Sequence, residues 1–349
     1  MIGLKIINWK FSIQLYKGKA TLSFNNITKN INPWWITGII DSEGKFIINY
    51  NKKTKKFSFS FKVVQDYKSL IILKYLVKYF LVGSVTLDYS KLEGYKYVVS
   101  NKKDIIDIII PHFDLYPLQG SKYLDFLDFK KCILLMEQDS STNIDLVLQI
   151  KKTINRSRSF EERWHYLKEK PFNLKPEWIQ AFINGAGSFQ YRIDQIFIWK
   201  HGHAVFDPIL EIPFPTHDIF LLKAIINFFS MGYIKPKYII FSLKESKKSR
   251  RTCLAIFNNY QIIIKFVDKY TMLTPKRLYY VEWKHIIGLR QKLDFPALKG
   301  KENLIRLRLD IFKTRLFNPN LITPKDKFDL AKSIFSTKKT HNLKSKIIR

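Results

Sequence analysis

Two acidic side chains stand two residues apart at the end of a short apolar segment, Ile-Thr-Gly-Ile-Ile-Asp-Ser-Glu-Gly, over 36–44. Carboxylates are a residue type that binds divalent cations, because Mg²⁺ prefers oxygen ligands. A related segment, Ile-Gln-Ala-Phe-Ile-Asn-Gly-Ala-Gly, occupies 179–187. It carries Asn184 where the first has Asp41, and Ala186 where the first has Glu43. Only the first segment therefore keeps its acids.

The two segments belong to a larger internal duplication. Trp35 aligns with Trp178, residues 61–85 align with 210–234, and residues 108–136 align with 262–290. The spacing between the aligned residues is 143, then 149, then 154, so it grows only slowly along the chain. This pattern indicates one duplicated unit with insertions in its loops.

Each unit shows the same order of predicted elements. In the first, a short helix precedes alternating stretches at 44–50 and 56–64, a helix at about 67–80, strands at 84–88 and 95–100, and helices at about 102–110 and 122–136. The order αββαββα predicts an α+β fold with two pseudo-symmetric repeats. Each repeat should form a four-stranded antiparallel, saddle-shaped sheet with helices on one face. The other face is left for solvent or a ligand.

The repeats divide the chain into five predicted parts. A charged stretch without an apolar stripe separates the two units and is interpreted as a linker. In chain order we expect a basic N-terminal arm at 1–30, the first repeat at 31–155, the linker at 156–175, the second repeat at 176–300 and a basic C-terminal extension at 301–349.

Small residues recur four apart in both short helices. Gly38 and Ser42 share one helix face, as do Ala181 and Gly185. Small side chains at this spacing let two backbones approach closely. We therefore expect the two helices to pack against each other and to join the two repeats.

These features carry a resemblance to a known family. The nonapeptides at 36–44 and 179–187 resemble the signature of the LAGLIDADG homing endonuclease and maturase family in its single-chain, two-repeat form, the second copy being degenerate. The resemblance extends over roughly 33–292. It implies two signature helices at the domain interface and paired sheets that bind duplex DNA.

The resemblance also implies roles for individual residues. In the family, the eighth position of each signature is an acid that holds Mg²⁺ near the cleaved phosphate, which fits Glu43 but not Ala186. Asn184, two residues before Ala186, stands where the first copy has Asp41. A polar residue at the end of the second strand matches Gln65 in the first half and Phe214 in the second. A basic residue on the fourth strand matches Lys96, with Arg250 or Arg251 as its counterpart. Mg²⁺ is expected as a cofactor only if the chain cleaves, and otherwise none.

Charge points to a polyanionic partner. The 349 residues include 60 Lys and Arg against 29 Asp and Glu, a formal net charge of +31. Neutralised phosphates release condensed counterions, so such an excess favours nucleic acid. Two clusters would lie at the rims of the sheets: Lys52, Lys53, Lys55 and Lys56 in the first repeat, and Lys244, Lys247, Lys248, Arg250 and Arg251 in the second.

Three functions remain open at this point. The favoured one is a nucleic-acid-binding descendant of a homing endonuclease that no longer cleaves and acts on structured RNA, as a group I intron maturase or a protein bound to organellar ribosomal RNA. An active or nicking Mg²⁺-dependent endonuclease acting on double-stranded DNA is the second. The third is a structural component of a mitochondrial ribonucleoprotein such as the mitoribosome.

Composition completes the expectations. The abundance of Lys, Ile, Phe, Tyr and Asn is typical of AT-rich codons and favours an organelle-encoded, mitochondrial protein. The chain has no apolar run of the roughly twenty residues that span a bilayer, so we expect no membrane partner. The duplication predicts a monomer with an internal pseudo-two-fold axis.

Overall fold

The computed structural model describes residues 12–16, 19–23, 31–66, 69–88, 94–138, 143–194, 205–238, 251–274 and 276–292. The chain divides into a main unit, 29–193 with 205–284, and a second unit made of the remaining residues. Within the predicted N-terminal arm, β1 (Ser12–Tyr16) and β2 (Lys19–Ser23) pair as an antiparallel hairpin. The predicted C-terminal extension lies outside the described residues.

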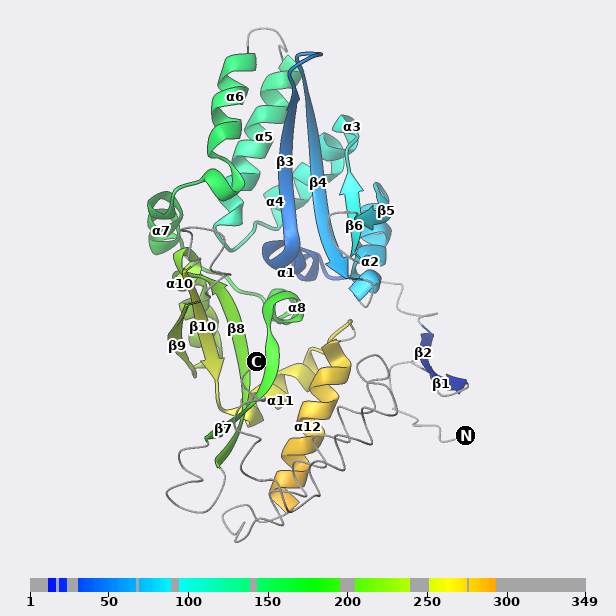
Figure 1. The fold of residues 1–349 in the computed structure, drawn as a ribbon, viewed down its shortest axis with the longest axis vertical. Coiled ribbons are helices and arrows are strands. Elements are labelled where there is room, and N and C mark those ends of the chain that lie inside the picture. The colour runs from blue at the N-terminus through cyan, green and yellow to red at the C-terminus, as the bar shows by residue number, and fades with distance from the viewer. Residues whose placement is uncertain are drawn as a thin grey trace, which may run out of the picture. The chain divides into compact units, whose positions relative to one another are not determined.

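The first repeat follows the predicted order of elements (Figure 1). Its sheet has the strand order β3-β4-β6-β5, and all its pairs are antiparallel. The elements are α1 (Pro33–Glu43), β3 (Gly44–Asn51), β4 (Lys56–Asp66), α2 (Leu70–Phe80), β5 (Ser84–Asp88), β6 (Gly94–Val99), α3 (Lys102–Asp104), η2 (Ile105–Ile109), α4 (Ile110–Leu115), α5 (Lys122–Gln138) and α6 (Ile144–Thr153).

The second repeat has the same topology. Its sheet order is β7-β8-β10-β9, the same arrangement as in the first repeat. Its elements are α8 (Pro176–Ala186), β7 (Ser188–Asp194), β8 (Val205–Pro215), η4 (Thr216–Asp218), α10 (Ile219–Phe229), β9 (Tyr233–Tyr238), β10 (Arg251–Phe257), α11 (Tyr260–Lys269) and α12 (Lys276–Lys292). The predicted fold of two helix-backed antiparallel sheets is therefore confirmed.

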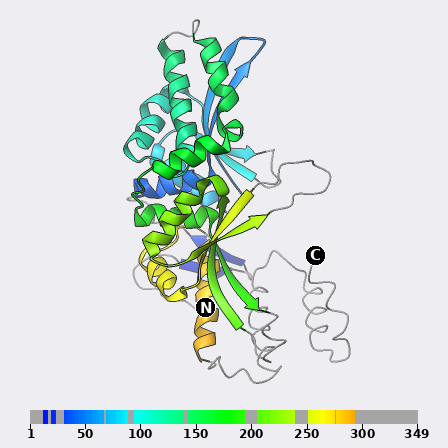
Figure 2. The same ribbon diagram turned by 90° about the vertical axis from the view of Figure 1, so that its left-hand side faces the viewer.

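The described helices of each repeat lie on one face of its sheet (Figure 2). In the first repeat, alternation along the strands buries Phe46 and Phe61 completely against helix side chains such as Phe113 and Phe126. Neighbouring side chains such as Lys45 point to the other face, because successive residues of a strand alternate in direction. We call this second face the open face.

The two repeats meet through α1 and α8, as the small residues predict. A Cβ atom at Gly38 would lie 2.4 Å from the Trp178 carbonyl oxygen and 2.8 Å from the Ala181 Cβ. A Cβ atom at Gly185 would lie 2.6 Å from the Ser42 Cβ. Both contacts are closer than side chains tolerate. The two helices therefore touch at both glycines, with Gly38 against the backbone of α8 and Gly185 against the Ser42 side chain.

The predicted linker contains a packed helix. The segment between the repeats forms η3 (Asn155–Ser157) and α7 (Phe160–Glu169), in which Leu167 is fully buried and Arg163 is 8% exposed. Arg158, just before α7, donates to Asp125 of α5 at 2.9 Å and pairs with Asp128. The sequence concealed this helix because it mixes polar contacts, such as Arg163 with Asp125 at 3.6 Å, with ring contacts, such as Trp164 with Phe220 at 4.8 Å.

No helix within the described part of the chain combines the length and apolar character needed to cross a membrane.

Candidate functional site

The two signature helices end side by side. Glu43 is the last residue of α1 and Ala186 the last residue of α8. A Cβ atom at Gly185 would lie 3.5 Å from the Cγ of Glu43, so the acid of the first copy lies against the end of the second. The strands β3 and β7 begin directly after these ends. The structure thus brings Glu43 and Ala186 to one place, and only Glu43 offers ligand atoms there.

A lysine binds the end of each signature helix. The Nζ atom of Lys122 donates to the Ile40 and Asp41 carbonyl oxygens at 2.6 and 2.8 Å. Its repeat counterpart, Lys276, donates to the Ile183 and Gly187 carbonyl oxygens at 3.2 and 2.5 Å. The Ile40 and Ile183 carbonyls also accept the N–H groups of Gly44 and Gly187, so each lysine adds a second donor at the end of its signature helix. The arrangement is pseudo-symmetric although the acids are not.

Both lysines lie in the electrostatic field of Glu43. Burial lowers the pKa of Lys122 to about 8, against the opposing effect of Asp41 and Glu43. Burial also lowers the pKa of Lys276 to about 8, against the opposing effect of Glu43. An amine with such a pKa exchanges its proton close to neutral pH, which suits proton transfer to or from water. The site therefore combines one carboxylate with two perturbed amines.

The sequence interpretation did not assign a role to these lysines. Lys122 and Lys276 fall at equivalent positions of the aligned repeats, which was the available signal. A basic residue kept in both copies, although one acid is lost, marks a position with its own function. Their contact with the helix ends depends on how the chain folds back, and the repeat alignment does not contain that information.

Asp41 has a structural role at the junction of the repeats. It is 2% exposed, and its carboxylate accepts from the Gln119 and Gly120 amides at 2.8 and 3.0 Å and from the Trp178 indole at 2.8 Å. Burial raises the pKa of Asp41, while the two amides and Lys122 act in the opposite direction. Both oxygens face N–H donors, so the geometry fits the ionised form. Asp41 thereby binds the second signature helix to the first repeat.

The second copy lacks this bond. Asn184 is 5% exposed and accepts from the Thr274 hydroxyl at 2.6 Å, but its Nδ2 is buried and has no hydrogen-bond partner among the described residues. The indole nitrogen of Trp35 is likewise buried without a partner there. Trp35 and Asn184 are the repeat counterparts of Trp178 and Asp41. Trp35 and Asn184 thus place two N–H donors at the positions where Trp178 donates to the Asp41 carboxylate.

Residues from both repeats hold the loop before Lys122. Asp218 of η4 is 3% exposed and accepts from the Ser121 amide at 2.8 Å and from its hydroxyl at 3.1 Å. Arg163 of α7 also donates to the Ser121 hydroxyl, at 3.0 Å, and Lys170 donates to the Leu118 carbonyl at 2.6 Å. The loop that leads into Lys122 is therefore fixed by the second repeat and by the helix between the repeats.

The equivalent loop of the second repeat cannot be held in this way. Its residue at the position of Ser121 is Pro275, which has no amide hydrogen. The residue at the position of Asp218 is Ser69 of the first repeat, which has no carboxylate. The loop before Lys276 therefore lacks the amide hydrogen, and the first repeat lacks the carboxylate that would accept it. Of the two loops, only the one before Lys122 has this hydrogen bond.

The donor set does not fit a two-metal site. Two-metal phosphodiester cleavage needs carboxylates that hold both ions, and Ala186 removes one of the two acids that the family places here. Within the described ranges, no cluster of three or more His, Cys, Asp or Glu side chains could bind a metal ion. Glu43 alone could supply one carboxylate to Mg²⁺, and the other ligands would have to be phosphate and water.

The remaining site residues predicted from the family lie on the sheets. Gln65 is the next-to-last residue of β4 and lies opposite Tyr95 of β6, and Phe214 is the next-to-last residue of β8 and lies opposite Cys253 of β10. Both lie on the helix-covered face of their sheets. The Gln65 Nε2 is buried without a partner in the described part of the chain, whereas Phe214 packs edge-on against Phe182 of α8 at 4.9 Å. A polar group beneath the first sheet thus corresponds to an aromatic ring beneath the second.

The proposed counterpart of Lys96 was wrong. Lys96 lies opposite Val64 on β6, on the open face of the first sheet, and its Nζ is 3.9 Å from Asp88. In the second sheet, the partner of Pro213, which is equivalent to Val64, is Leu254. The strand register therefore places Leu254, and neither Arg250 nor Arg251, at the position of Lys96. Similar basic residues nearby had suggested the wrong alignment.

The structure describes the side chains of the first predicted lysine cluster, but not those of the second. Lys52, Lys53 and Lys55 form the exposed turn between β3 and β4, with Lys56 at the start of β4. This turn lies at the tip of the hairpin, where its amines are available to phosphates. In the second repeat, Lys244, Lys247, Lys248 and Arg250 lie outside the described residues, and for Arg251 the structure describes only the backbone at the start of β10.

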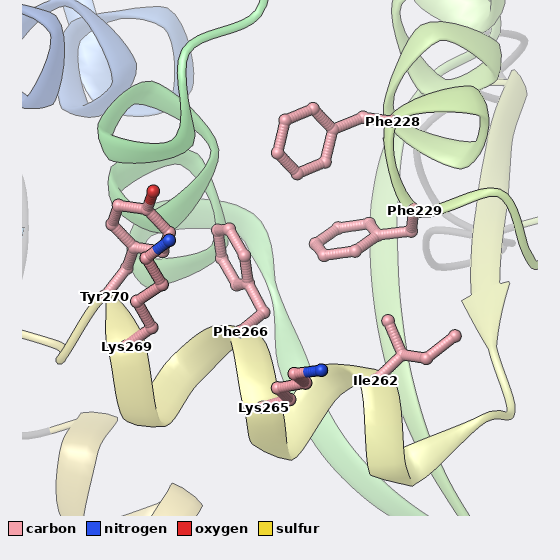
Figure 3. Close-up of a pocket in the computed structure, with 7 residues that line it drawn as sticks. All are labelled: Phe228, Phe229, Ile262, Lys265, Phe266, Lys269 and Tyr270. Carbon is pink, nitrogen blue, oxygen red and sulfur yellow. The ribbon is translucent and has the colours of Figure 1, made fainter.

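A shallow groove of about 250 Å³ lies on the helices of the second repeat (Figure 3). Its walls are Phe228 and Phe229 of α10 and residues of α11, including Phe266. At the positions of Phe228 and Phe266 the first repeat has Tyr79 and His112, which hydrogen-bond at 3.1 Å. The polar pair thus corresponds to two phenyl rings in an edge-on contact at 5.9 Å. None of the residues described above at the ends of α1 and α8 lines this groove.

Comparison with known proteins gives a consistent family assignment. A family model described as LAGLIDADG endonuclease matches residues 36–133 and 179–287, which together exceed half of the chain. The chain is 26% identical to the probable intron-encoded endonuclease 2 of Neurospora crassa over 80% of its own length, and 27% identical to the probable intron-encoded endonuclease 3 of the same fungus over 81%. It spans 64% and 55% of the lengths of these two relatives.

Solved structures show the same fold. The LAGLIDADG homing endonuclease I-SmaMI bound to cleaved DNA superposes with a TM-score of 0.65 at 24% sequence identity, over 81% of this chain and 97% of that one. At this identity the similarity establishes the architecture of the two repeats and no further property.

Proposed function

Because the chain belongs to the LAGLIDADG endonuclease family, we propose that it is a nucleic-acid-binding protein that retains the family fold but has lost double-strand cleavage. The observation that carries this proposal is Ala186 at the end of α8, directly after Gly185, whose Cβ position lies 3.5 Å from the Cγ of Glu43. A double-strand break needs one competent site for each strand, and the methyl group of alanine cannot bind a metal ion.

The binding half of the function is supported by what both repeats keep. The two sheets, the α1–α8 junction and the exposed lysine turn at 52–55 are all present in the structure. The net charge of +31 favours a phosphate-rich partner. Loss of an acid together with retention of the scaffold is expected where binding, and not cleavage, is under selection.

The proposal is tested by restoring the missing acid. A duplex that the chain selects from a random DNA library is placed in a supercoiled plasmid, and the plasmid is incubated with the chain and Mg²⁺. We expect the wild-type chain to bind the plasmid without producing linear DNA, and Ala186→Glu to produce linear DNA. The matched control Ala186→Gln has a similar volume without the charge and should produce none. Linear DNA from the wild type, abolished by Glu43→Gln, would refute the proposed loss of double-strand cleavage.

The nature of the nucleic acid is a further part of the proposal. A binder free of cleavage can act on structured RNA, as an intron maturase or a ribosomal-RNA-binding protein does, and such a chain would be encoded and used in the mitochondrion. Competition between an intron-containing precursor RNA and the selected duplex, measured by filter binding, separates the two targets. An RNA that competes at least tenfold better than the duplex would favour the RNA target, and the reverse order would favour DNA.

A second candidate is a strand-nicking endonuclease, and one arrangement favours it. Glu43 remains in place, and both perturbed lysines, Lys122 and Lys276, lie within its field. One competent half-site would cut one strand only. In the plasmid assay this candidate predicts nicked circles from the wild-type chain and none from Glu43→Gln, with no linear product from either.

A further inference from the structure

The open faces of the two sheets can be compared residue by residue. In the first sheet Phe61 of β4 lies opposite Val99, and in the second its repeat counterpart Leu210 lies opposite Phe257. This register also fixes the remaining equivalent positions, because β4 corresponds to β8 and β6 corresponds to β10. On the open face, Ser60 corresponds to Ile209, Lys62 to Glu211, Val64 to Pro213, Lys96 to Leu254 and Val98 to Ile256.

Polar side chains lie on every strand of the open face of the first sheet, alongside Val64 and Val98. Lys45 and Asn49 on β3 are exposed, as are Ser58 on β4 and Thr86 on β5. Lys62 and Lys96 lie between them on the two central strands and are half-buried. These side chains offer ammonium, amide and hydroxyl groups side by side. Such groups recognise the edges of bases in the major groove of a DNA duplex.

The central strands of the second sheet present the opposite character. Ile209, Leu254 and Ile256 are 2%, 8% and 1% exposed and form one apolar cluster on the open face. β10 is therefore buried on both faces, since Ala255 and Phe257 on the helix side are also fully buried. The side chains of this cluster carry no hydrogen-bonding group, so they offer nothing to the edge of a base.

Three of the polar side chains that the structure describes in the second sheet, Glu211, Gln190 and Lys235, are poorly suited to base recognition. Glu211, in the place of Lys62, is an acid that phosphates repel. On the edge strand β7, Gln190 already donates to Ser188 at 2.6 Å. Lys235 on β9 is exposed but lies on the other edge strand, where a lysine serves a phosphate as well as a base.

From this asymmetry we propose that the chain reads the sequence of a DNA duplex mainly through its first sheet, over one half of the target, whereas the second sheet contributes sequence-independent contacts to the backbone. This inference rests on the proposed nucleic-acid binding and adds to it which half of the protein determines specificity. Lys62 is the central specificity residue, because it lies in the middle of the polar face.

Selection from a random DNA duplex library, followed by sequencing, tests the proposal. The expected consensus is one-sided: base preferences are strong in one half of the bound site and weak in the other. Base substitutions in the strong half should lower affinity about tenfold each, because each removes a base contact that distinguishes the correct base from the others. Substitutions in the weak half should change affinity less than about threefold. A consensus with equal preferences in both halves would overturn the inference while leaving the proposed binding intact.

Matched variants assign the strong half to the first sheet. Lys62→Ala should weaken binding and relax base preference at its position, whereas Lys235→Ala should weaken binding to all sequences alike. Glu211→Lys places the first-repeat residue at the equivalent position of the second, and it should add a base preference in the weak half that the uncharged Glu211→Gln does not add. If Lys62→Ala leaves every base preference unchanged while its circular dichroism matches the wild type, the assignment is wrong. If the library yields no retained duplex at all, the inference and DNA binding both fail, and the RNA competition assay decides what remains of the proposed function.

Discussion

Trp35 and Trp178 form a natural matched pair for measuring the bond that joins the two repeats. Both indoles are buried, with 3% and 0% of their surfaces exposed, and phenylalanine removes the same atoms from each. Only Trp178 donates to a carboxylate, Asp41, at 2.8 Å, while the Trp35 nitrogen has no partner in the described structure. The difference between the two substitutions therefore isolates the hydrogen bond from the loss of packing.

The magnitude follows from the two environments. A hydrogen bond to a charged group contributes about 1.5–3 kcal/mol, so Trp178→Phe loses that amount in addition to its cavity cost. A buried donor without a partner costs about 1–3 kcal/mol, so Trp35→Phe recovers that amount against the same cavity cost. We expect Trp178→Phe to be less stable than Trp35→Phe by at least about 2.5 kcal/mol, the sum of the two lower limits.

Urea unfolding followed by far-ultraviolet circular dichroism measures this difference. The comparison holds if the two variants share one dependence of unfolding free energy on urea, because a changed slope indicates a changed unfolded state or an intermediate. Asp41→Asn combined with each substitution gives a double-mutant cycle, which should show coupling with Trp178 and none with Trp35. Equal stabilities within about 1 kcal/mol, or a less stable Trp35→Phe, would refute the role given to the indole–carboxylate bond.

Two further predictions concern the same junction. Gly38→Val should destabilise the chain by about 3 kcal/mol or more in thermal unfolding, because its Cβ would lie 2.4 Å from the Trp178 carbonyl oxygen. Gly288→Ala is the control: it lies in a helix with no atom within 4 Å of the added Cβ and should be neutral or slightly stabilising, and equal losses in both variants would contradict the packing argument. The pKa of Lys122 falls from 10.5 to about 8 on folding, so the unfolded chain binds more protons between these values and stability should rise with pH across that window. Lys122→Met should flatten this rise in pH-dependent urea unfolding, and an unchanged slope would show that Lys122 does not titrate as described.

The architecture was predictable because the chain contains it twice. Repeated apolar positions reduce the chance that one misleading stretch decides the prediction. The helix junction was predicted from small residues four apart in each helix, Gly38 with Ser42 and Ala181 with Gly185. Local alternation was equally informative: Phe46 and Lys45 take opposite faces of β3, as a strand requires.

The candidate site was only partly predictable. Glu43 and Ala186 belong to a contiguous motif, so their places at the helix ends followed from it. Lys122, Asp218 and Arg163 reach the same region from separate elements, and their meeting depends on packing that has no local pattern. The helix α7 was missed for a related reason, since its buried arginine contacts polar groups and breaks the expected apolar periodicity.

The loop before Lys122 has a consequence for the history of the gene. A duplication begins with two identical halves, and each half could then assemble with a copy of itself. Two first repeats would now meet with Ser69 where Asp218 accepts from Ser121, and two second repeats would bring Pro275 to a carboxylate that needs an amide hydrogen. Neither half can form this hydrogen bond with its own copy. The two repeats have therefore diverged in a complementary way, and the second repeat supports the loop of the first even though its own acid is gone.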